Sequence, residues 1–387
     1  MGDPRAAGPW STWFDERADA IRAADRWRAP RAFDAAGPEG RLDGRTVVSF
    51  ASNDYLGLTT HPTVRAAAVA AIERWGTGST ASRLIVGSRP VHHDLETAIA
   101  EWRGTPSAVL LPTGFAANLG LLATLGGRGV RIASDALNHA SIIDGCRVAR
   151  SNGADVVTYA HLDLEELDDR LAAPGAARRI VVTDSVFSMD GDGVDLDPLL
   201  EVCARHDALL VLDEAHSVLE SLPDAGDSGV TIVQVGTLSK TAGSLGGFVA
   251  GPTSLVELLV NLARPYIFTT APTPADCAAA LAAIGIIGSA EGDDLRRRLR
   301  SHIDSLRPGH RSPIIPIVLG DESTALAAAA QLLEHGILVP AIRPPTVPIG
   351  GSRLRIALSA AHTDDQVATL RATLDALGHA DAREGVR

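Results

Sequence analysis

Between about residue 90 and residue 250, short apolar runs alternate with stretches of helical periodicity. The runs are continuously apolar, which is typical of strands that are buried on both faces of a parallel sheet. They lie at Ser107–Leu111, Arg131–Ala133, Asp155–Tyr159, Arg179–Thr183, Ala208–Leu212, Ile232–Val235 and Phe248–Ala250. This pattern predicts an α/β domain with a largely parallel sheet.

The length of 387 residues predicts more than one domain. We expect an N-terminal helical segment over residues 1–50, a large domain over 51–288 and a smaller C-terminal α/β domain over 289–387. Within the first segment, an Arg- and Ala-rich helix is expected over Trp13–Arg28. This segment is too poor in core residues to fold alone, so it must pack on the body of the chain or on a second subunit.

Two stretches are expected to be loops. Gly76–Gly87 is dense in small residues, so it is either a flexible loop or a place where the backbone comes close to a ligand. Arg343–Gly351 is too rich in proline for a regular element and predicts an ordered loop beside a strand over Arg353–Leu358.

Charge and cysteine content argue against several classes of protein. The net charge is -12 and no basic tract stands out beyond Arg296–Arg298, which argues against nucleic-acid binding. The three cysteines are odd in number and widely separated, so neither a disulfide framework nor a zinc site is expected. No apolar stretch approaches the ~20 residues of a membrane span. We therefore expect a cytoplasmic protein that binds neither nucleic acid nor membrane.

Polar side chains follow the predicted strands at the points where these strands end. In parallel α/β sheets, ligands bind beyond the carboxyl ends of the strands. The turn Pro112–Asn118 opens a helix whose free N–H groups suit a phosphate, although one such turn is weak evidence. The other groups at strand ends are His139, Asp184, Ser188, Asp213 and His216. Taken alone, a histidine such as His139 is more often structural than catalytic, and an isolated aspartate such as Asp213 is by default a helix cap.

The stretch Val235–Gly247 contains Lys240, the only lysine beside 34 arginines. A lysine amine can lose its proton on burial and form a Schiff base, whereas a guanidinium stays protonated. A surviving surface lysine is the alternative, but Gly, Ser and Thr neighbours suit a phosphate-bearing cofactor. Asp213 ends a buried strand 27 residues earlier, and a carboxylate there can keep a pyridine nitrogen protonated. Together these groups predict pyridoxal 5'-phosphate (PLP) as the cofactor.

With these residues identified, the sequence resembles the α-oxoamine synthases, a branch of the fold-type I PLP enzymes. The resemblance runs from about Arg22 to the last helix, and it rests on motifs in a shared order. These are Ser52–Leu58, Gly76–Arg83, Asn138–Gly145, Val186–Asp192, Asp213–Ser217, Gly236–Lys240, Pro344–Pro348 and Arg353–Arg355. The resemblance implies a PLP-dependent transferase of fold type I, with a large domain built on a mostly parallel sheet, a smaller C-terminal α/β domain, and homodimers with shared active sites.

The resemblance also implies a role for each matching residue. Lys240 would be the Schiff-base lysine, Asp213 the partner of the pyridine nitrogen, and His139 the imidazole stacked on the ring. By the same matching, His216 and Ser188 resemble residues that contact the hydroxyl side of the ring, and Gly114, Phe115 and Thr237 resemble the phosphate site. Thr269 and Thr270 resemble residues that contact the cofactor phosphate of the neighbouring subunit. Asn53 and Arg355 resemble the site for the amino-acid carboxylate, and Arg28 and Thr346 resemble residues that contact the acyl substrate. On residue type alone, an arginine at 353 or 355 is equally a surface cation.

The implied reaction is the decarboxylative condensation of L-alanine with a pimeloyl thioester, carried by coenzyme A or by acyl carrier protein, in biotin synthesis. The alternatives are another α-oxoamine synthase, such as a 2-amino-3-ketobutyrate CoA ligase, and a non-catalytic sensor with the same fold. The sequence departs from the family pattern at Ser217–Gly229, which lacks the usual glycine-rich continuation, and at Thr241–Ala242. Both departures bear on the choice of acyl donor.

Overall fold

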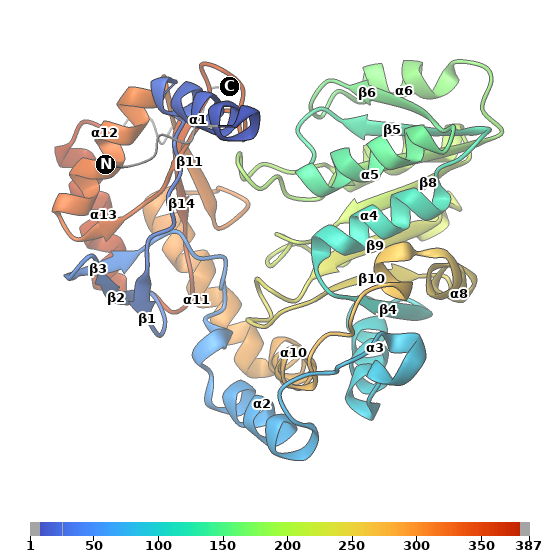
Figure 1. Cartoon of the computed structure of the whole chain (residues 1–387), viewed down its shortest axis with the longest axis horizontal. Helices are drawn as coiled ribbons and strands as arrows, with labels where there is room; N and C mark the ends of the chain where they lie inside the picture. The colour runs from blue at the N-terminus through green and yellow to red at the C-terminus, as the bar shows by residue number, and fades with distance from the viewer. Residues whose placement is uncertain (1–7, 25, 380–387) are drawn as a thin grey trace. The chain divides into compact units, whose positions relative to one another are not determined.

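The computed structural model describes residues 8–24 and 26–379, which form two compact units (Figure 1). The large unit comprises Ser52–Ile314 and Leu358–Thr363, and the small unit comprises the described residues up to Ala51, Ile315–Ala357 and those from Asp364 onward. The domain boundaries expected from the sequence, between residues 50 and 51 and between residues 288 and 289, remain a prediction, and the two compact units are a separate description of the chain.

The large unit is built on a seven-stranded sheet in the order β4-β10-β9-β8-β7-β5-β6. β10 runs antiparallel to β4 and β9, and the other neighbouring strands are parallel. The strands are β4 (Ser107–Leu111), β5 (Val130–Asp135), β6 (Asp155–Tyr159), β7 (Arg178–Asp184), β8 (Ala208–Asp213), β9 (Ile232–Thr237) and β10 (Gly247–Gly251). Each predicted apolar run is one of these strands, so the predicted, mostly parallel sheet is confirmed.

Both faces of this sheet are covered by helices. Successive residues of a strand point to opposite faces, so Val182 and Val211 join one apolar core whereas Val181 and Leu210 join the other. The first core includes residues of α4 (Gly114–Leu125), α5 (Ala140–Ser151) and α8 (Thr253–Leu262). The second includes residues of α6 (Leu164–Ala172) and α7 (Leu196–Arg205). Burial on both faces explains why the strands are continuously apolar.

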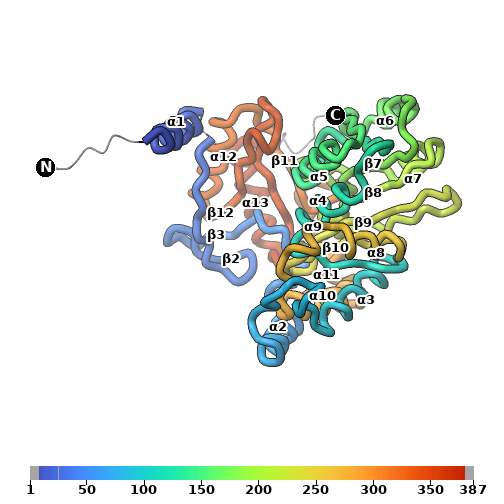
Figure 2. The backbone as a smooth tube through the Cα atoms, turned by 45° about the vertical axis from the view of Figure 1, so that its right-hand side comes forward, coloured from blue at the N-terminus to red at the C-terminus, as the bar shows by residue number. Residues whose placement is uncertain are grey.

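The remaining helices of the large unit lie beyond this layered region. α2 (Pro62–Trp75), α3 (Pro90–Trp102) and α10 (Pro274–Ile287) pack together, as Figure 2 shows. α9 (Arg264–Ile267) follows α8, and α11 (Ala290–Leu306) follows α10. The short turns are η1 (Leu58–Thr60), η2 (Arg83–Gly87) and η3 (Gly226–Ser228).

The loop that contains Gly76–Gly87 is anchored by a buried arginine. Arg83 donates from both terminal nitrogens to Glu96, at 2.9 Å each, and from Nε to Ser88 at 2.8 Å. The same Glu96 carboxylate accepts the backbone N–H of Leu110 in β4 at 2.9 Å. A buried bidentate pair that also binds the sheet edge argues against a flexible loop.

The small unit contains two small sheets, with the strand orders β1-β2-β3-β12 and β11-β14-β13. Its strands are β1 (Phe33–Ala35), β2 (Glu39–Leu42), β3 (Arg45–Ser49), β11 (Ile314–Gly320), β12 (Ile337–Leu338), β13 (Ala341–Ile342) and β14 (Ser352–Ala357). Its helices are α1 (Pro9–Ala23), α12 (Glu322–Glu334) and α13 (Asp364–Ala376). The stretch Arg343–Gly351 follows β13 without a regular element, as predicted.

The predicted helix Trp13–Arg28 is wrong at both ends. α1 begins at Pro9, because proline is well suited to the first helical position. It ends at Ala23, and Trp27 and Arg28 lie in irregular chain. No residue of α1 is buried.

Over residues 8–24 and 26–379, no single helix is long and apolar enough to cross a membrane, and only α10 and α11 taken together, bent by 79°, meet the length and composition requirement.

Candidate functional site

A cavity of about 180 Å³ lies at the carboxyl ends of the parallel strands in the large unit. Its lining includes eight residues to which the family resemblance gave a role, which are Gly114, Phe115, His139, Ser188, Asp213, His216, Thr237 and Lys240. Thr113, Ser141, Asp184, Ala215 and Ser239 complete the lining. Cavities of about 320 and 380 Å³ lie elsewhere in this unit. The smaller cavity is the candidate site, because it brings a lysine, two carboxylates and two imidazoles together.

Asp213 is the buried carboxylate at the end of β8, with a relative exposure of 5%. Its Oδ2 accepts a hydrogen bond from Nδ2 of Asn118 at 2.6 Å, and its Oδ1 accepts the backbone N–H of Ala215 at 3.0 Å. Asn118 lies on α4, so this amide holds the strand end against the helix. Both oxygens of this buried carboxylate therefore accept a hydrogen bond.

The same Asn118 amide connects Asp213 to His139. Its Nδ2 also donates to Oγ of Ser141 at 2.9 Å, and Ser141 Oγ lies 2.8 Å from Nδ1 of His139. Nδ1 of His139 further accepts the backbone N–H of Ser141 at 3.3 Å, so His139 is the N-cap of α5 as well as a lining residue of the cavity. Because Nδ1 accepts, the proton of the neutral ring lies on Nε2.

The charge state of His139 follows from its surroundings. Burial lowers the pKa of His139, and the positive charge of Lys240 also lowers it, although Asp213 acts in the opposite direction. Its backbone N–H donates to Oδ2 of Asp184 at 2.9 Å. Burial raises the pKa of Asp184 well above its usual range, and the negative charge of Asp213 raises it further. The ring beside Lys240 is therefore a neutral imidazole near pH 7.

His216 is oriented by a buried tyrosine. The hydroxyl of Tyr55 lies 2.6 Å from Nδ1 of His216 and donates to Oδ1 of Asn53 at 3.0 Å. A phenol has one proton to donate, so His216 Nδ1 carries a hydrogen and donates to the Tyr55 oxygen. Asn53 thus acts on this site through Tyr55.

The far end of the cavity combines a helix N-terminus with hydroxyl groups. Thr113 caps α4 by accepting the backbone N–H of Ala116 at 3.1 Å. Gly114 leaves space there, because a Cβ on this residue would lie 3.2 Å from Cβ of Thr237. Oγ1 of Thr237 lies 2.7 Å from Oγ of Ser239 and donates to the carbonyl of Gly246 at 3.0 Å. Free N–H groups beside two hydroxyls form a site suited to a phosphate.

Six of the predicted residues lie outside the cavity lining. Thr269 and Thr270 follow α9, and Thr270 forms an isolated bridge with Ser82. Asn53 belongs to the large unit, whereas Arg28, Thr346 and Arg355 belong to the small unit. Arg28 donates to the carbonyl of Pro344 at 3.2 Å, two residues before Thr346. Arg355 is 5% exposed in β14, so it is not a surface cation.

Sequence reasoning missed the residues that support the lining residues. Tyr55 and Ser141 belong to the motifs Ser52–Leu58 and Asn138–Gly145, and Asn118 to the turn Pro112–Asn118, but the sequence predicts no role for them. Asn118 carried a detectable signal, because it is a single amide in a strongly apolar helix and such a group needs a buried partner. Tyr55 and Ser141 carried no signal that distinguishes a buried partner from an ordinary neighbour.

Comparison with known proteins gives concordant results. The family model for class I and II aminotransferases matches residues 45–374. The 8-amino-7-oxononanoate synthase of Anaeromyxobacter dehalogenans is 46% identical over 364 residues, which is 89% of each chain. A structure of serine palmitoyltransferase with a PLP internal aldimine has a TM-score of 0.86 and 31% identity, and covers 96% of this chain and 99% of that chain. The 8-amino-7-oxononanoate synthase of Francisella tularensis has a TM-score of 0.70 and 27% identity, with coverage of 86% and 98%.

The fold and the site therefore define a fold-type I enzyme, and the chain belongs to the class I and II aminotransferase family. Within that class, its relatives are α-oxoamine synthases, and the 8-amino-7-oxononanoate synthase of Anaeromyxobacter dehalogenans, at 46% identity, shares more sequence with it than the serine palmitoyltransferase does, at 31%. The resemblance stated from the sequence is confirmed.

The Asn118 amide yields a stability prediction. Replacing Asn118 with Leu removes the side-chain donor to a buried carboxylate, so the free energy of unfolding should fall by about 2 kcal/mol. Urea unfolding of cofactor-free protein measures this change. The same substitution at Asn261, whose exposed amide donates to the carbonyl of Glu257, should cost less than about 0.5 kcal/mol. Equal losses in the two variants would contradict the assigned role of Asn118.

Proposed function

We propose that the chain is a cytoplasmic, PLP-dependent acyltransferase of biotin biosynthesis. It condenses L-alanine with a pimeloyl thioester of coenzyme A or acyl carrier protein, giving 8-amino-7-oxononanoate, CO2 and the free carrier thiol. The observation that carries this proposal is the single cavity in which the only lysine of the chain lies with Asp213 and His139. The 46% identity to an 8-amino-7-oxononanoate synthase supports the choice of substrates.

The residues of the cavity fit PLP. Oδ1 of Asn118 is buried and has no hydrogen-bond partner among the described residues, so the amide is oriented by the two bonds that its nitrogen donates toward Asp213 and Ser141. The carboxylate of Asp213, which this amide holds in place, suits a protonated pyridine nitrogen. The space that a Cβ at Gly114 would fill, beside Thr237 and the start of α4, suits a phosphate. Lys240 supplies the amine that would hold the aldehyde carbon.

Each residue then contributes one physical effect to the reaction. When bound, PLP supplies a cationic ring that withdraws electrons from the α-carbon of the amino acid. Asp213 would pair with the protonated ring nitrogen, and Asn118 holds the Asp213 carboxylate in place. The amine of Lys240 would be the base that removes the α-proton. His139, a neutral imidazole with its hydrogen on Nε2, would stack on the ring and donate to a developing oxyanion.

The substrate contacts are proposed from the family resemblance. Arg355 would bind the carboxylate of alanine, because a guanidinium can donate two parallel hydrogen bonds to a carboxylate. Asn53 would take part in the same contact, and Tyr55 holds its side chain. Arg28 and Thr346 would contact the acyl substrate. The bond from Arg28 to the carbonyl of Pro344 supports this pairing, because it connects the N-terminal segment to the loop of Thr346.

A substrate panel tests the proposed reaction. Alanine, glycine and serine are each combined with pimeloyl, acetyl, succinyl and palmitoyl thioesters, and thiol release is measured. We expect alanine with the pimeloyl donor to give the highest kcat/KM, by at least about tenfold. Highest activity with glycine and acetyl thioester would instead indicate a 2-amino-3-ketobutyrate ligase. Preference for serine and palmitoyl thioester would match the similarity to serine palmitoyltransferase, and no turnover of any pair would favour a non-catalytic sensor.

We further propose a homodimer with shared active sites. Exposed apolar side chains gather at η2, where Leu84, Ile85 and Val86 are 51%, 74% and 65% exposed. η2 lies against α9, which is followed by Phe268 at 68% exposure. An apolar surface of this kind is typical of an interface between subunits. Thr269 and Thr270 are next in the chain, which supports contacts with the cofactor phosphate of a second subunit.

Substitution of Ile85 tests the dimer. The wild-type protein should elute in size-exclusion chromatography with light scattering at twice the chain mass of 40.3 kDa. Ile85→Asp places a charge in the proposed interface, so the protein should shift toward the monomer and lose activity in parallel. Leu326→Asp, at a position that is 38% exposed in the small unit, is the control and should stay dimeric. A monomeric wild-type protein would refute the proposal.

A further inference from the structure

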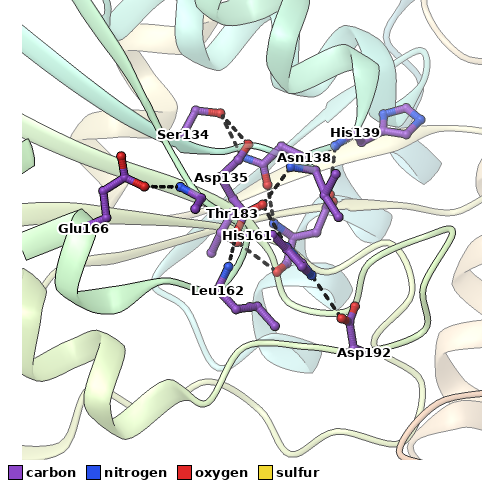
Figure 3. Close-up of polar contacts among 12 residues, drawn as sticks. Ser134, Asp135, Asn138, His139, His161, Leu162, Glu166, Thr183 and Asp192 are labelled. Atoms are coloured by element: carbon purple, nitrogen blue, oxygen red, sulfur yellow. Dashed lines mark hydrogen bonds and ion pairs between the residues drawn. The ribbon is translucent and has the colours of Figure 1, made fainter. Parts of the chain in front are cut away.

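Asp135 at the end of β5 holds two neighbouring loops. Its side chain is completely buried. Oδ1 accepts the backbone N–H of Leu137 at 2.8 Å, and Oδ2 accepts the backbone N–H of Leu162 at 2.8 Å (Figure 3). Leu162 has a φ of 58°, which is a strained conformation for a leucine. Such a backbone persists only where its surroundings fix it, and this strained residue directly follows His161.

His161 lies between two carboxylates. Its Nδ1 is 3.0 Å from Oδ1 of Asp135, and its Nε2 is 3.0 Å from Oδ2 of Asp192 (Figure 3). An ionised carboxylate accepts hydrogen bonds and cannot donate them, so both ring nitrogens carry hydrogen and the side chain is an imidazolium. Burial by itself would lower the pKa of His161, but the two hydrogen bonds outweigh it and raise the pKa to about 10.

The second carboxylate belongs to the loop that carries Ser188. The carbonyl of Asp192 accepts the backbone N–H of Phe187 at 2.9 Å, and Val186 forms a bridge with Gly193, so the loop closes on itself around Ser188. His161 also meets the ring of Phe187 edge-on, with 4.4 Å between the ring centroids. Oδ1 of Asp192 is buried without a hydrogen-bond partner among the described residues. The Asp192 side chain as a whole is 43% exposed, so it is the bond between its Oδ2 and His161 that ties this loop to the histidine.

The first carboxylate supports the loop that carries His139. The bond from Leu137 to Asp135 fixes the turn before Asn138. Nδ2 of Asn138 donates to the carbonyl of Val182 at 2.8 Å, and its Oδ1 accepts the backbone N–H of Asp184 at 3.0 Å. His139 follows at once and donates its own N–H to Asp184. The two loops that meet at His161 thus present His139 and Ser188 to the same cavity.

We propose that His161 is a positioning residue, whose imidazolium fixes the loop of Ser188 against the loop of His139 and so sets the shape of the cofactor cavity. His161 does not line the cavity, and it acts through the two loops. The inference rests on the proposed function in one respect, because it takes His139 and Ser188 to contact PLP. The opposing explanation is a purely structural ion network, which would contribute to stability without affecting the cavity.

The test compares two histidine–carboxylate pairs of the same unit. His161→Gln breaks the double pair. His206→Gln breaks the pair in which Nε2 of His206 lies 2.6 Å from Oδ1 of Asp168, between α6 and α7 and away from both loops. The dissociation constant for PLP, kcat, and KM for the thioester are measured in full-length holoenzyme, with the thermal unfolding midpoint of each variant.

For His161→Gln we expect the dissociation constant for PLP to rise about tenfold and kcat to fall about 10- to 100-fold, because small displacements of positioned groups have effects of this size. KM for the thioester should change less than about threefold. Asp192→Asn keeps an oxygen that can accept the hydrogen bond from Nε2 of His161, so the changes in the dissociation constant for PLP and in kcat should be smaller than in His161→Gln. This variant replaces His161→Gln in the test if His161→Gln does not fold. His206→Gln should stay within about twofold of wild type in all three. A loss of stability in His161→Gln with unchanged PLP binding and kcat would overturn the proposal.

A measurement without cofactor separates this inference from the proposed function. In cofactor-free protein, amide hydrogen exchange over residues 136–139 and 186–191 should be at least about tenfold faster in His161→Gln than in wild type, and unchanged in His206→Gln. Unchanged exchange in both loops would refute the positioning role whether or not PLP binds. If exchange is faster in His161→Gln but the wild-type protein binds no PLP, the role of His161 in holding the two loops is supported and the proposed function is refuted.

Discussion

The site depends on the hydrogen bonds that hold a buried carboxylate at the end of β8. A buried polar group is costly unless hydrogen bonds replace its contacts with water. At Asp213 the Asn118 amide and the backbone N–H of Ala215 supply the donors. Because the same amide reaches His139 through Ser141, the positions of the carboxylate and the imidazole are set together.

The parallel sheet explains how residues distant in sequence meet in one cavity. Parallel strands present their carboxyl ends at one edge, so Asp213 at the end of β8 meets His139, Ser188 and Lys240, which lie in the segments after β5, β7 and β9. The loops themselves are not held by the ladder of the sheet. They depend on side-chain carboxylates and amides at the strand ends, of which Asp135 and Asn138 are examples.

Sequence periodicity predicted the strands of the large unit because strands covered on both faces are continuously apolar. It could not predict that β10 runs antiparallel, because an apolar run carries no direction. The end of α1 was misplaced because alanine and arginine favour helix on both sides of Ala23, so local preference does not mark the boundary. The lining residues were found through motif chemistry, but Asn118, Tyr55 and His161 act on other side chains, and such pairings are set by tertiary contacts. The burial of Arg355 likewise depends on its neighbours in space.

The central claim is that Lys240 binds the aldehyde of PLP in the cavity beside Asp213. The most direct measurement is borohydride reduction of protein incubated with PLP, followed by peptide mass mapping. Lys240 is the only lysine, so the account predicts a single modified peptide that contains residue 240. Lys240→Arg keeps the charge but cannot form a Schiff base, so this control should lack the modification and the visible absorption band. An unmodified Lys240 in wild-type protein, or an unchanged absorption band in Lys240→Arg, would contradict the account.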